Sequence, residues 1–580
     1  MHASAPLRLS RALVLLLAFF AALTCARAIG VLPLSEVKPG AIGTVLTVFQ
    51  GTKPEAFKVR VTGVLENALG PGKSLIICEL TDPRVQNMGA AAGMSGSPLY
   101  IDGKLAGALS YQIQHFETVH FAGFTPAQDL DEVRDAGTAS PSPGAAEAVN
   151  GPAGTFLPLK PVFSFGGLSP QVEALVAQPF ADLGVALGAP AGGGSSQAAP
   201  AAAPALRPGS PISAALCVGD ITLGATGTVS IVDGSHIVAF GHPMMGLGNT
   251  ELPFCSADIL TILPSTMSSF KLANIGGVIG TLQEDRLSGV GGVIGRMPEL
   301  IDVSVRVHPV SGAPRLLHFQ VVRDQSLTPM IIASGVLQGL LGSNDSAVSN
   351  GFRLDASIGY PGRAPLPLHL LFPGTQAFVL GLRDFAMELS ALLYNPYQRV
   401  FPDKIRLDIA ALGENPMAVV DQFQLSRSVA RPGETVVASV SWRDFQGAVH
   451  RAQIPFTADP AWAGKSIDVV LMSGQALDQL TGRGRVLSAA QFRSFDAYAR
   501  AVCDDRRPDG AYLAVVERTS LFADQGVTTP ELPGSLERIA RVADDARFQN
   551  ITAYASLFER HVIPGRLTYV ELRRTLRVDD

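Results

Sequence analysis

Short segments in which every second residue is apolar recur along most of the chain, and glycine or proline separates them. Residues 43–49 and 57–63 alternate in this way, a pattern that indicates half-buried β-strands. Asp102-Gly103 and Asp233-Gly234 each lie between two apolar runs, which is typical of a tight β-hairpin. The 59 glycines and 41 prolines supply the turns that many short strands need. The sequence therefore predicts a mostly β protein built from closed or sandwiched antiparallel sheets.

Length and charge narrow the classes of protein further. At about 150 residues per domain, 580 residues suggest three or four domains. The 45 basic and 50 acidic residues create no positive field, so we expect no nucleic-acid partner. The chain contains neither a Cys-x-x-Cys nor a His-Glu-x-x-His motif, so we expect no metal and no cofactor.

The first 28 residues have the features of a signal peptide. Arg8 and Arg11 precede an apolar run over residues 12–23, and Ala26-Arg27-Ala28 has the small-x-small form of a cleavage site. That run is shorter than the ~20 residues that cross a bilayer as a helix, and no later stretch is long enough. We therefore expect cleavage near Ala28, export to the periplasm or the extracellular space, and no membrane span after cleavage.

Two segments rich in Ala, Gly, Ser and Pro, residues 135–154 and 189–211, read as linkers. They divide the mature chain into a β-barrel block (29–134), linkers with a bridge segment (135–211) and a second β-barrel block (212–412). A C-terminal region (416–580) follows, in which turn residues separate short strands as in a β-sandwich. A helix is expected over residues 489–502. We expect this region to be accessory, with an envelope protein as the partner it could bind. Cys217 and Cys255 either pair or remain free.

The segment Ala91-Ala-Gly-Met-Ser-Gly-Ser-Pro98 carries the strongest chemical signal. A nucleophilic serine needs a tight turn whose backbone N–H groups converge on one point and hold an oxyanion. Gly93 and Gly96 flank Ser95 and permit such a turn, in which the N–H groups of Gly93 and Ser95 are the oxyanion donors. The alternative is a glycine-rich turn with incidental serines.

A nucleophilic serine also needs a base, and His242 in Phe240-Gly-His-Pro is the candidate. His236 on the same hairpin competes with it, and His115 and His120 lie near Ser95 in sequence. A structural role, in which His242 caps a strand by a hydrogen bond, is the alternative.

The serine segment, with the following Ile101-Asp-Gly-Lys-Leu-Ala-Gly-Ala108, closely resembles the nucleophile segment of the SpoIVB peptidase family. The resemblance implies a serine peptidase with a chymotrypsin-like double β-barrel. Leu80-Thr-Asp-Pro resembles the stretch that carries the triad aspartate, which would be Asp82. Residues 227–242 resemble the strand that ends in Gly-His, so that the base would be His242.

The chain departs from the family pattern in three respects. The serine segment precedes the histidine segment, so the two halves are permuted. We find no PDZ-like segment, and the spacing from Asp82 to Ser95 is shorter than expected. The triad acid is therefore the least secure assignment, and Asp258 is the second candidate.

These features support an exported serine endopeptidase that acts on a protein or peptide substrate through an acyl-enzyme, with Ser95, His242 and Asp82 as its triad. The alternative is a non-catalytic binding or scaffold protein of the envelope that keeps a peptidase-like fold. A carbohydrate-active enzyme would need a recognisable pair of carboxylates, which the sequence lacks.

Overall fold

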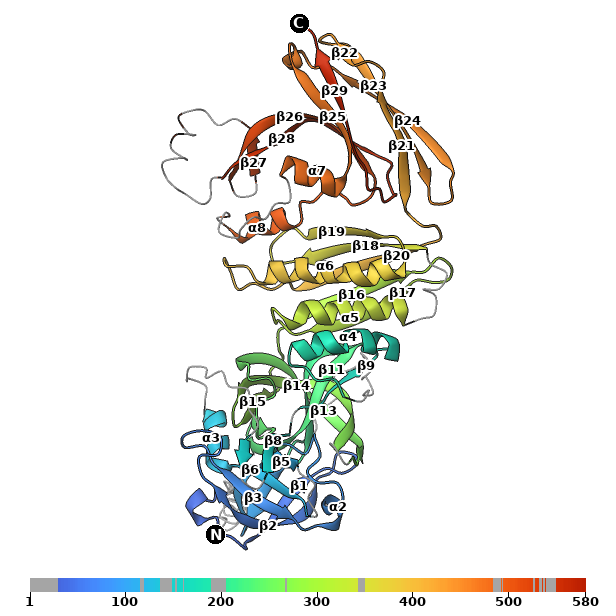
Figure 1. The fold of residues 1–580 in the computed structure, drawn as a ribbon. Helices are drawn as coiled ribbons and strands as arrows, with labels where there is room; N and C mark the ends of the chain where they lie inside the picture. Colours follow the sequence, from blue (N-terminus) through green and yellow to red (C-terminus); the bar gives the residue numbers. More distant parts are fainter. Residues whose placement is uncertain are drawn as a thin grey trace, which may run out of the picture.

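The computed structural model describes residues 30–114, 119–135, 149–151, 154–159, 161–188, 205–265, 269–342, 350–482, 492, 494–524, 527–530, 535, 538 and 549–580. The predicted signal peptide, His115 and most of both predicted linkers lie outside these residues. The molecule is elongated, with two barrels at the N-terminal end, a layer of helices and strands in the middle and a sandwich at the C-terminal end (Figure 1). No helix in the described ranges is long and apolar enough to cross a membrane.

The first barrel closes a ring of strands in the order β4-β1-β2-β3-β6-β5, because β4 also pairs with β5. The predicted hairpin at Asp102-Gly103 is confirmed, with positive φ of 49° and 76° at the two turn residues. The strands are β1 (Ile42–Thr47), β2 (Glu55–Leu65), β3 (Leu75–Leu80), β4 (Pro98–Ile101), β5 (Lys104–Gln114) and β6 (Phe121–Pro126). Around them lie η1 (Leu34–Glu36), α2 (Pro83–Gln86), α3 (Ala127–Asp135), β7 (Val149–Gly151) and β8 (Gly154–Pro158).

The second barrel closes in the order β10-β13-β14-β15-β12-β11, because β11 also pairs with β10. Its predicted hairpin is also confirmed, since Asp233 pairs with His236 across the turn between β11 and β12. The strands are β10 (Pro211–Gly219), β11 (Thr222–Asp233), β12 (His236–Ala239), β13 (Gly248–Leu263), β14 (Phe270–Arg286) and β15 (Gly289–Ile294). Two closed antiparallel barrels confirm the predicted mostly β, chymotrypsin-like architecture.

The remainder of residues 212–412, together with residues 163–182, forms an α/β layer that the sequence pattern did not indicate. The sheet of the second barrel continues through β17 into β16, β20, β18 and β19. Helices α4, α5 and α6 pack one on another along this sheet (Figure 1). The elements are β9 (Phe163–Gly166), α4 (Pro170–Asp182), β16 (Ile301–His308), β17 (Arg315–Val321), α5 (Leu327–Leu341), β18 (Gly351–Gly359), β19 (Leu366–Phe372), α6 (Thr375–Leu393) and β20 (Lys404–Leu412).

The C-terminal region is the predicted sandwich, in which two sheets enclose one core with Phe423, Val469 and Leu513. The predicted helix over 489–502 is present as α8 (Phe495–Val502), and residues 489–491 and 493 lie outside the description. The other elements are β21 (Ala418–Leu425), β22 (Val429–Ala430), β23 (Thr435–Asp444), β24 (Val449–Thr457), η3 (Pro460–Trp462), β25 (Ser466–Ser473), α7 (Gly474–Thr481), β26 (Ala511–Asp524), β27 (Val527–Pro530), β28 (Gln549–Val562) and β29 (Glu571–Val578).

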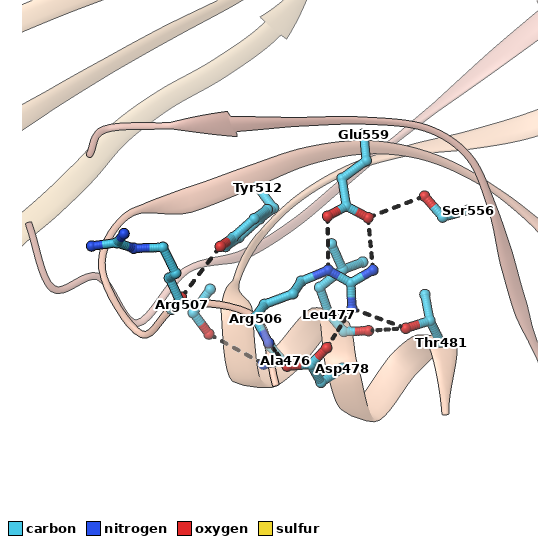
Figure 2. Close-up of polar contacts among 10 residues, drawn as sticks. Ala476, Leu477, Asp478, Thr481, Arg506, Arg507, Tyr512, Ser556 and Glu559 are labelled. Carbon is cyan, nitrogen blue, oxygen red and sulfur yellow. Dashed lines mark hydrogen bonds and ion pairs between the residues drawn. The ribbon is translucent and has the colours of Figure 1, made fainter. Parts of the chain in front are cut away.

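A buried arginine joins α7 to the sheet of this sandwich. Arg506 forms an ion pair with Asp478 on α7 and a two-pronged pair, at 2.9 and 2.7 Å, with Glu559 on β28 (Figure 2). Arg506 also donates to Thr481 at 3.2 Å. Loss of one partner from such a buried group typically costs about 3–5 kcal/mol because the remaining charges stay buried. The arginine therefore fixes α7 on the sheet.

The four cysteines that follow the predicted signal peptide are free. Cys217 and Cys255 do not form the disulfide that the sequence left open, and the Cys217 thiol donates to the carbonyl of Ile221 at 3.2 Å. Burial raises the pKa of the Cys255 thiol to about 12, so that this thiol stays protonated and unreactive at neutral pH.

Candidate active site between the two barrels

The turn that carries Ser95 belongs to the first barrel and is docked on strand β11 of the second. The backbone N–H of Thr228 donates to the carbonyl of Ser95 at 2.8 Å, and its hydroxyl donates to the carbonyl of Gly93 at 3.0 Å. The Ser230 hydroxyl donates to the carbonyl of Gly96 at 2.7 Å. The second barrel therefore holds three carbonyls of the turn, those of Gly93, Ser95 and Gly96.

Glycine is required at position 96 for two reasons. Its φ of +90° lies in the left-handed region, which favours glycine. A Cβ at this position would also lie 2.0 Å from the carbonyl oxygen of Thr228 and 2.4 Å from the nitrogen of Phe240. Close docking of the two barrels is thus possible only with glycine beside Ser95.

The polar groups expected to react are left without partners. Within the described part of the chain, the N–H groups of Gly93 and Ser95 donate to no acceptor, and the Ser95 hydroxyl makes no hydrogen bond. Ser95 is buried, with 1% of its surface exposed. Buried polar groups are usually hydrogen-bonded, so unpartnered ones call for an explanation, such as a catalytic role. These N–H groups are the donors that the sequence assigned to an oxyanion.

His242 lies at the edge of the second barrel next to the serine turn. The carbonyl of Leu109 accepts from Gly96 at 2.7 Å and lies 3.1 Å from the position of a Cβ at Gly241. The hydroxyl of Thr125 donates to the carbonyl of Gly241 at 2.7 Å. The first barrel therefore contacts both Gly96 and the residue before His242, so the structure brings the serine and histidine segments together.

The environment of His242 sets its tautomer and its charge. Nδ1 lies 2.7 Å from the carbonyl of Pro243, and because a carbonyl can only accept, Nδ1 carries the proton. Nε2 is buried and has no partner among the described residues. Burial lowers the pKa of His242 to about 4, against the opposing effect of the nearby carbonyls of Pro243 and Leu159. At neutral pH the ring is uncharged, and Nε2 carries a free lone pair.

The loop after His242 is held by a carboxylate that sequence reasoning missed. Asp285 on β14 accepts from the N–H groups of Met244 at 2.7 Å, Met245 at 2.8 Å and Leu247 at 3.1 Å. Burial raises the pKa of Asp285, and its backbone hydrogen bonds oppose this rise. Asp285 therefore fixes the path of the chain after His242. The sequence offered one signal for Asp285, namely its place as an acidic residue near the end of β14, a strand rich in buried residues.

The other predicted acids and histidines lie apart from this arrangement. Asp82 caps α2, and its carboxylate binds Arg84 through Nε and Nη2, both at 3.1 Å. These hydrogen bonds from Arg84 lower the pKa of Asp82. Asp258 is exposed on β13, and His236 is exposed on β12. His120 lies beside Gly89 in the first barrel. The structure thus shows neither Asp82 nor Asp258 hydrogen-bonded to His242. The Nδ1 atom of His242 faces the carbonyl of Pro243 instead.

An apolar cavity of about 350 Å³ opens beside His242. Its walls come from β8, β9, the end of α4 and the loop after His242. They include Pro158, Phe163, Ala181, Leu183, Met244 and Met245. Apart from the imidazole, the side chains of the described residues that line it are apolar, so the cavity can accept a large apolar side chain.

Sequence reasoning also missed Lys271, which is buried at the interface of the barrels near Gly93. A signal was present, because Lys271 alternates in phase with Ala273 and Ile275, which are both buried. An inward-facing lysine in an apolar strand is rare.

Comparison with known proteins gives one match. Residues 20–118 match the family described as SpoIVB peptidase S55. This range includes Asp82 and Ser95 and ends before His242. No curated protein and no solved structure matches the chain.

Proposed function

We propose that this chain, whose residues 20–118 match the SpoIVB peptidase family, is a serine endopeptidase that forms an acyl-enzyme at Ser95. The observation that carries the proposal is the set of unpartnered groups between the barrels: the Ser95 hydroxyl, the N–H groups of Gly93 and Ser95, and Nε2 of His242. A nucleophile, two oxyanion donors and a proton acceptor are the parts that acyl transfer requires.

Each group then has a step in the reaction. His242 Nε2 takes the proton of the Ser95 hydroxyl as Oγ attacks the scissile carbonyl carbon. The N–H groups of Gly93 and Ser95 stabilise the oxyanion of the tetrahedral intermediate. The imidazolium gives its proton to the leaving amine, and water, activated by the same nitrogen, hydrolyses the ester at Ser95. The carbonyl of Pro243 keeps the proton on Nδ1 and so orients the ring.

The assignment of Asp82 as the orienting acid stays a prediction. It requires the carboxylate to leave Arg84, which binds it in this structure. Export through cleavage near Ala28 likewise belongs to the proposal.

The burial of the site determines how a substrate reaches it. Ser95 and His242 are 1% and 0% exposed, so a peptide must displace part of the surrounding structure before it reaches Oγ. Closed sites of this kind open on binding in many enzymes. The apolar cavity next to His242 favours a substrate with a large apolar side chain near the scissile bond.

Labelling with a fluorophosphonate tests the proposal. We expect the mature wild-type protein to be modified at Ser95, as peptide mapping by mass spectrometry will show, and Ser95→Ala to remain unmodified. Ser97→Ala is the matched control, because Ser97 lies in the same turn but donates to the carbonyl of Met94 at 2.6 Å. Modification that persists in Ser95→Ala would assign the nucleophile to another residue.

A binding or scaffold protein on the same fold is the second candidate. It is favoured by one observation: Nε2 of His242 makes no hydrogen bond to Ser95 in this closed arrangement. In that case the C-terminal sandwich would hold an envelope partner, and the wild-type protein would not react with the fluorophosphonate at any pH at which His242 is neutral.

A further inference from the structure

Lys271 is a buried lysine that contacts both barrels. It lies at the start of β14, and its Nζ is 2.9 Å from Thr47 Oγ1 on β1 and 3.5 Å from Thr228 Oγ1 on β11. Within the described part of the chain it makes no ion pair. Buried charges are normally paired, so a buried lysine with only hydroxyl partners requires an explanation.

The backbone and stem of Lys271 support the serine turn. Its N–H donates to the carbonyl of Ala92 at 2.9 Å. Because the peptide between Ala92 and Gly93 is planar and trans, fixing this carbonyl also fixes the opposite direction of the Gly93 N–H. A Cβ at Gly93 would lie 3.0–3.2 Å from Cβ, Cγ and Cδ of Lys271, so the lysine stem packs directly against Gly93.

The amino group of Lys271 reaches the turn through Thr228. The Thr228 hydroxyl donates to the carbonyl of Gly93, and its N–H donates to the carbonyl of Ser95. Since the hydroxyl proton is already committed to Gly93, Oγ1 of Thr228 is an acceptor toward Nζ of Lys271. One lysine thus contacts Thr228, the residue that holds the carbonyls of Gly93 and Ser95.

We infer that Lys271 is a positioning residue of the candidate active site, which keeps the N–H groups of Gly93 and Ser95 directed at a substrate carbonyl. The inference rests on the proposed function of Ser95. Lys271 acts through the turn and through Thr228, and its charge state determines how well the turn is held.

The neutral amine suits this arrangement better than the ammonium. Burial lowers the pKa of Lys271 to about 7. The two N–H groups of the neutral amine can donate to Thr47 and Thr228, whereas the ammonium brings a third donor and an unpaired charge into the interface. The ordered turn is therefore favoured as the pH rises through about 7, separately from His242, whose pKa is about 4.

Burial alone accounts for this pKa, and no charged group on the packed strands contributes to it. β1 has no titratable side chain. The titratable residues elsewhere on β11, β13 and β14 are Asp233, Glu251, Cys255, Asp258, Glu284, Asp285 and Arg286.

The test compares Lys271→Met with Lys58→Met in the full mature chain. Lys58 donates to Thr44 at 2.7 Å on the exposed surface of the same barrel and is the matched control. The first measurement is the rate of fluorophosphonate labelling from pH 5.5 to 9. The second is amide hydrogen exchange in the peptide that covers residues 91–98.

We expect the labelling rate of the wild type to rise with pH as Lys271 loses one proton near pH 7, and then to level off. Lys271→Met should lose this inflection, label about 10²-fold more slowly at pH 8 because the donors are misplaced, and exchange faster in residues 91–98. Lys58→Met should match the wild type in both measurements.

If Lys271→Met keeps the wild-type pH profile and the wild-type exchange, the inference is wrong. If the wild type does not label at all, the proposed function fails, and the exchange measurement still decides the inference. Should Lys271→Met not fold, Thr228→Val breaks the same link with little change in shape, and unchanged exchange in residues 91–98 would overturn the inference.

Discussion

Nδ1 of His242 is held by the main-chain carbonyl of Pro243, and the carboxylate of Asp285 is occupied with the N–H groups of the following loop. The sequence allowed Ser95, Gly93 and His242 to be proposed because a glycine-flanked serine and a strand-ending histidine are local patterns. The partners of Asp82 could not be predicted in the same way. Its position after a strand fits a triad acid, but Arg84, two residues later, lies within reach and binds it.

The charge state of His242 leads to a prediction on stability. The pKa falls from 6.5 to about 4 on folding, so the unfolded chain binds more protons between these values. The contribution to stability is complete above pH 6.5 and is lost as the pH falls toward 4. As the pH falls from 6.5 to 4, the free energy of unfolding of the wild type should decrease. We expect this decrease to be about 3 kcal/mol smaller in His242→Gln.

Urea unfolding at a series of pH values measures this difference. His236→Gln is the control, because His236 is exposed on the same hairpin and should leave the pH dependence unchanged. Equal acid destabilisation in the wild type and His242→Gln would show that His242 titrates normally in the folded protein.

At the scale of elements, alternating strands and Asp-Gly hairpins could be predicted, whereas buried helices could not. α5 is apolar around nearly its whole circumference and therefore lacks the amphipathic period by which helices are identified. Its Gly335 allows close packing, since a Cβ there would lie 2.4 Å from the Phe319 ring. The buried position of Lys271 could not be predicted either, because lysine is normally an exposed residue.

The end of α4 provides a test of the apolar cavity. Ala181 lines the cavity, so Ala181→Trp should fill it and slow labelling by a peptidyl phosphonate that carries a phenylalanine side chain, by about tenfold or more. Labelling by a small alkyl fluorophosphonate should not change. Leu175→Trp, at an exposed position of the same helix, is the control. Equal effects on both probes would argue against a subsite for an apolar side chain.

At the scale of the whole molecule, the double barrel was predictable through the resemblance of three short segments to one family. The α/β layer and its continuity with the second barrel could not be predicted, since they depend on pairings between distant strands such as β16 and β20, which are parallel and about 100 residues apart. At this scale, the docking of the two barrels brings the segments of Ser95 and His242 to one interface.

A crystal structure of the mature protein after reaction with a fluorophosphonate tests whether Ser95 and His242 act together at this interface. We predict a bond from phosphorus to Ser95 Oγ, with a phosphoryl oxygen about 2.7–3.1 Å from the nitrogens of Gly93 and Ser95. Nε2 of His242 should lie within hydrogen-bond distance, about 2.6–3.2 Å, of an oxygen on the adduct. An unmodified Ser95, or an adduct at Ser95 with the His242 ring turned away and out of reach, would contradict the account.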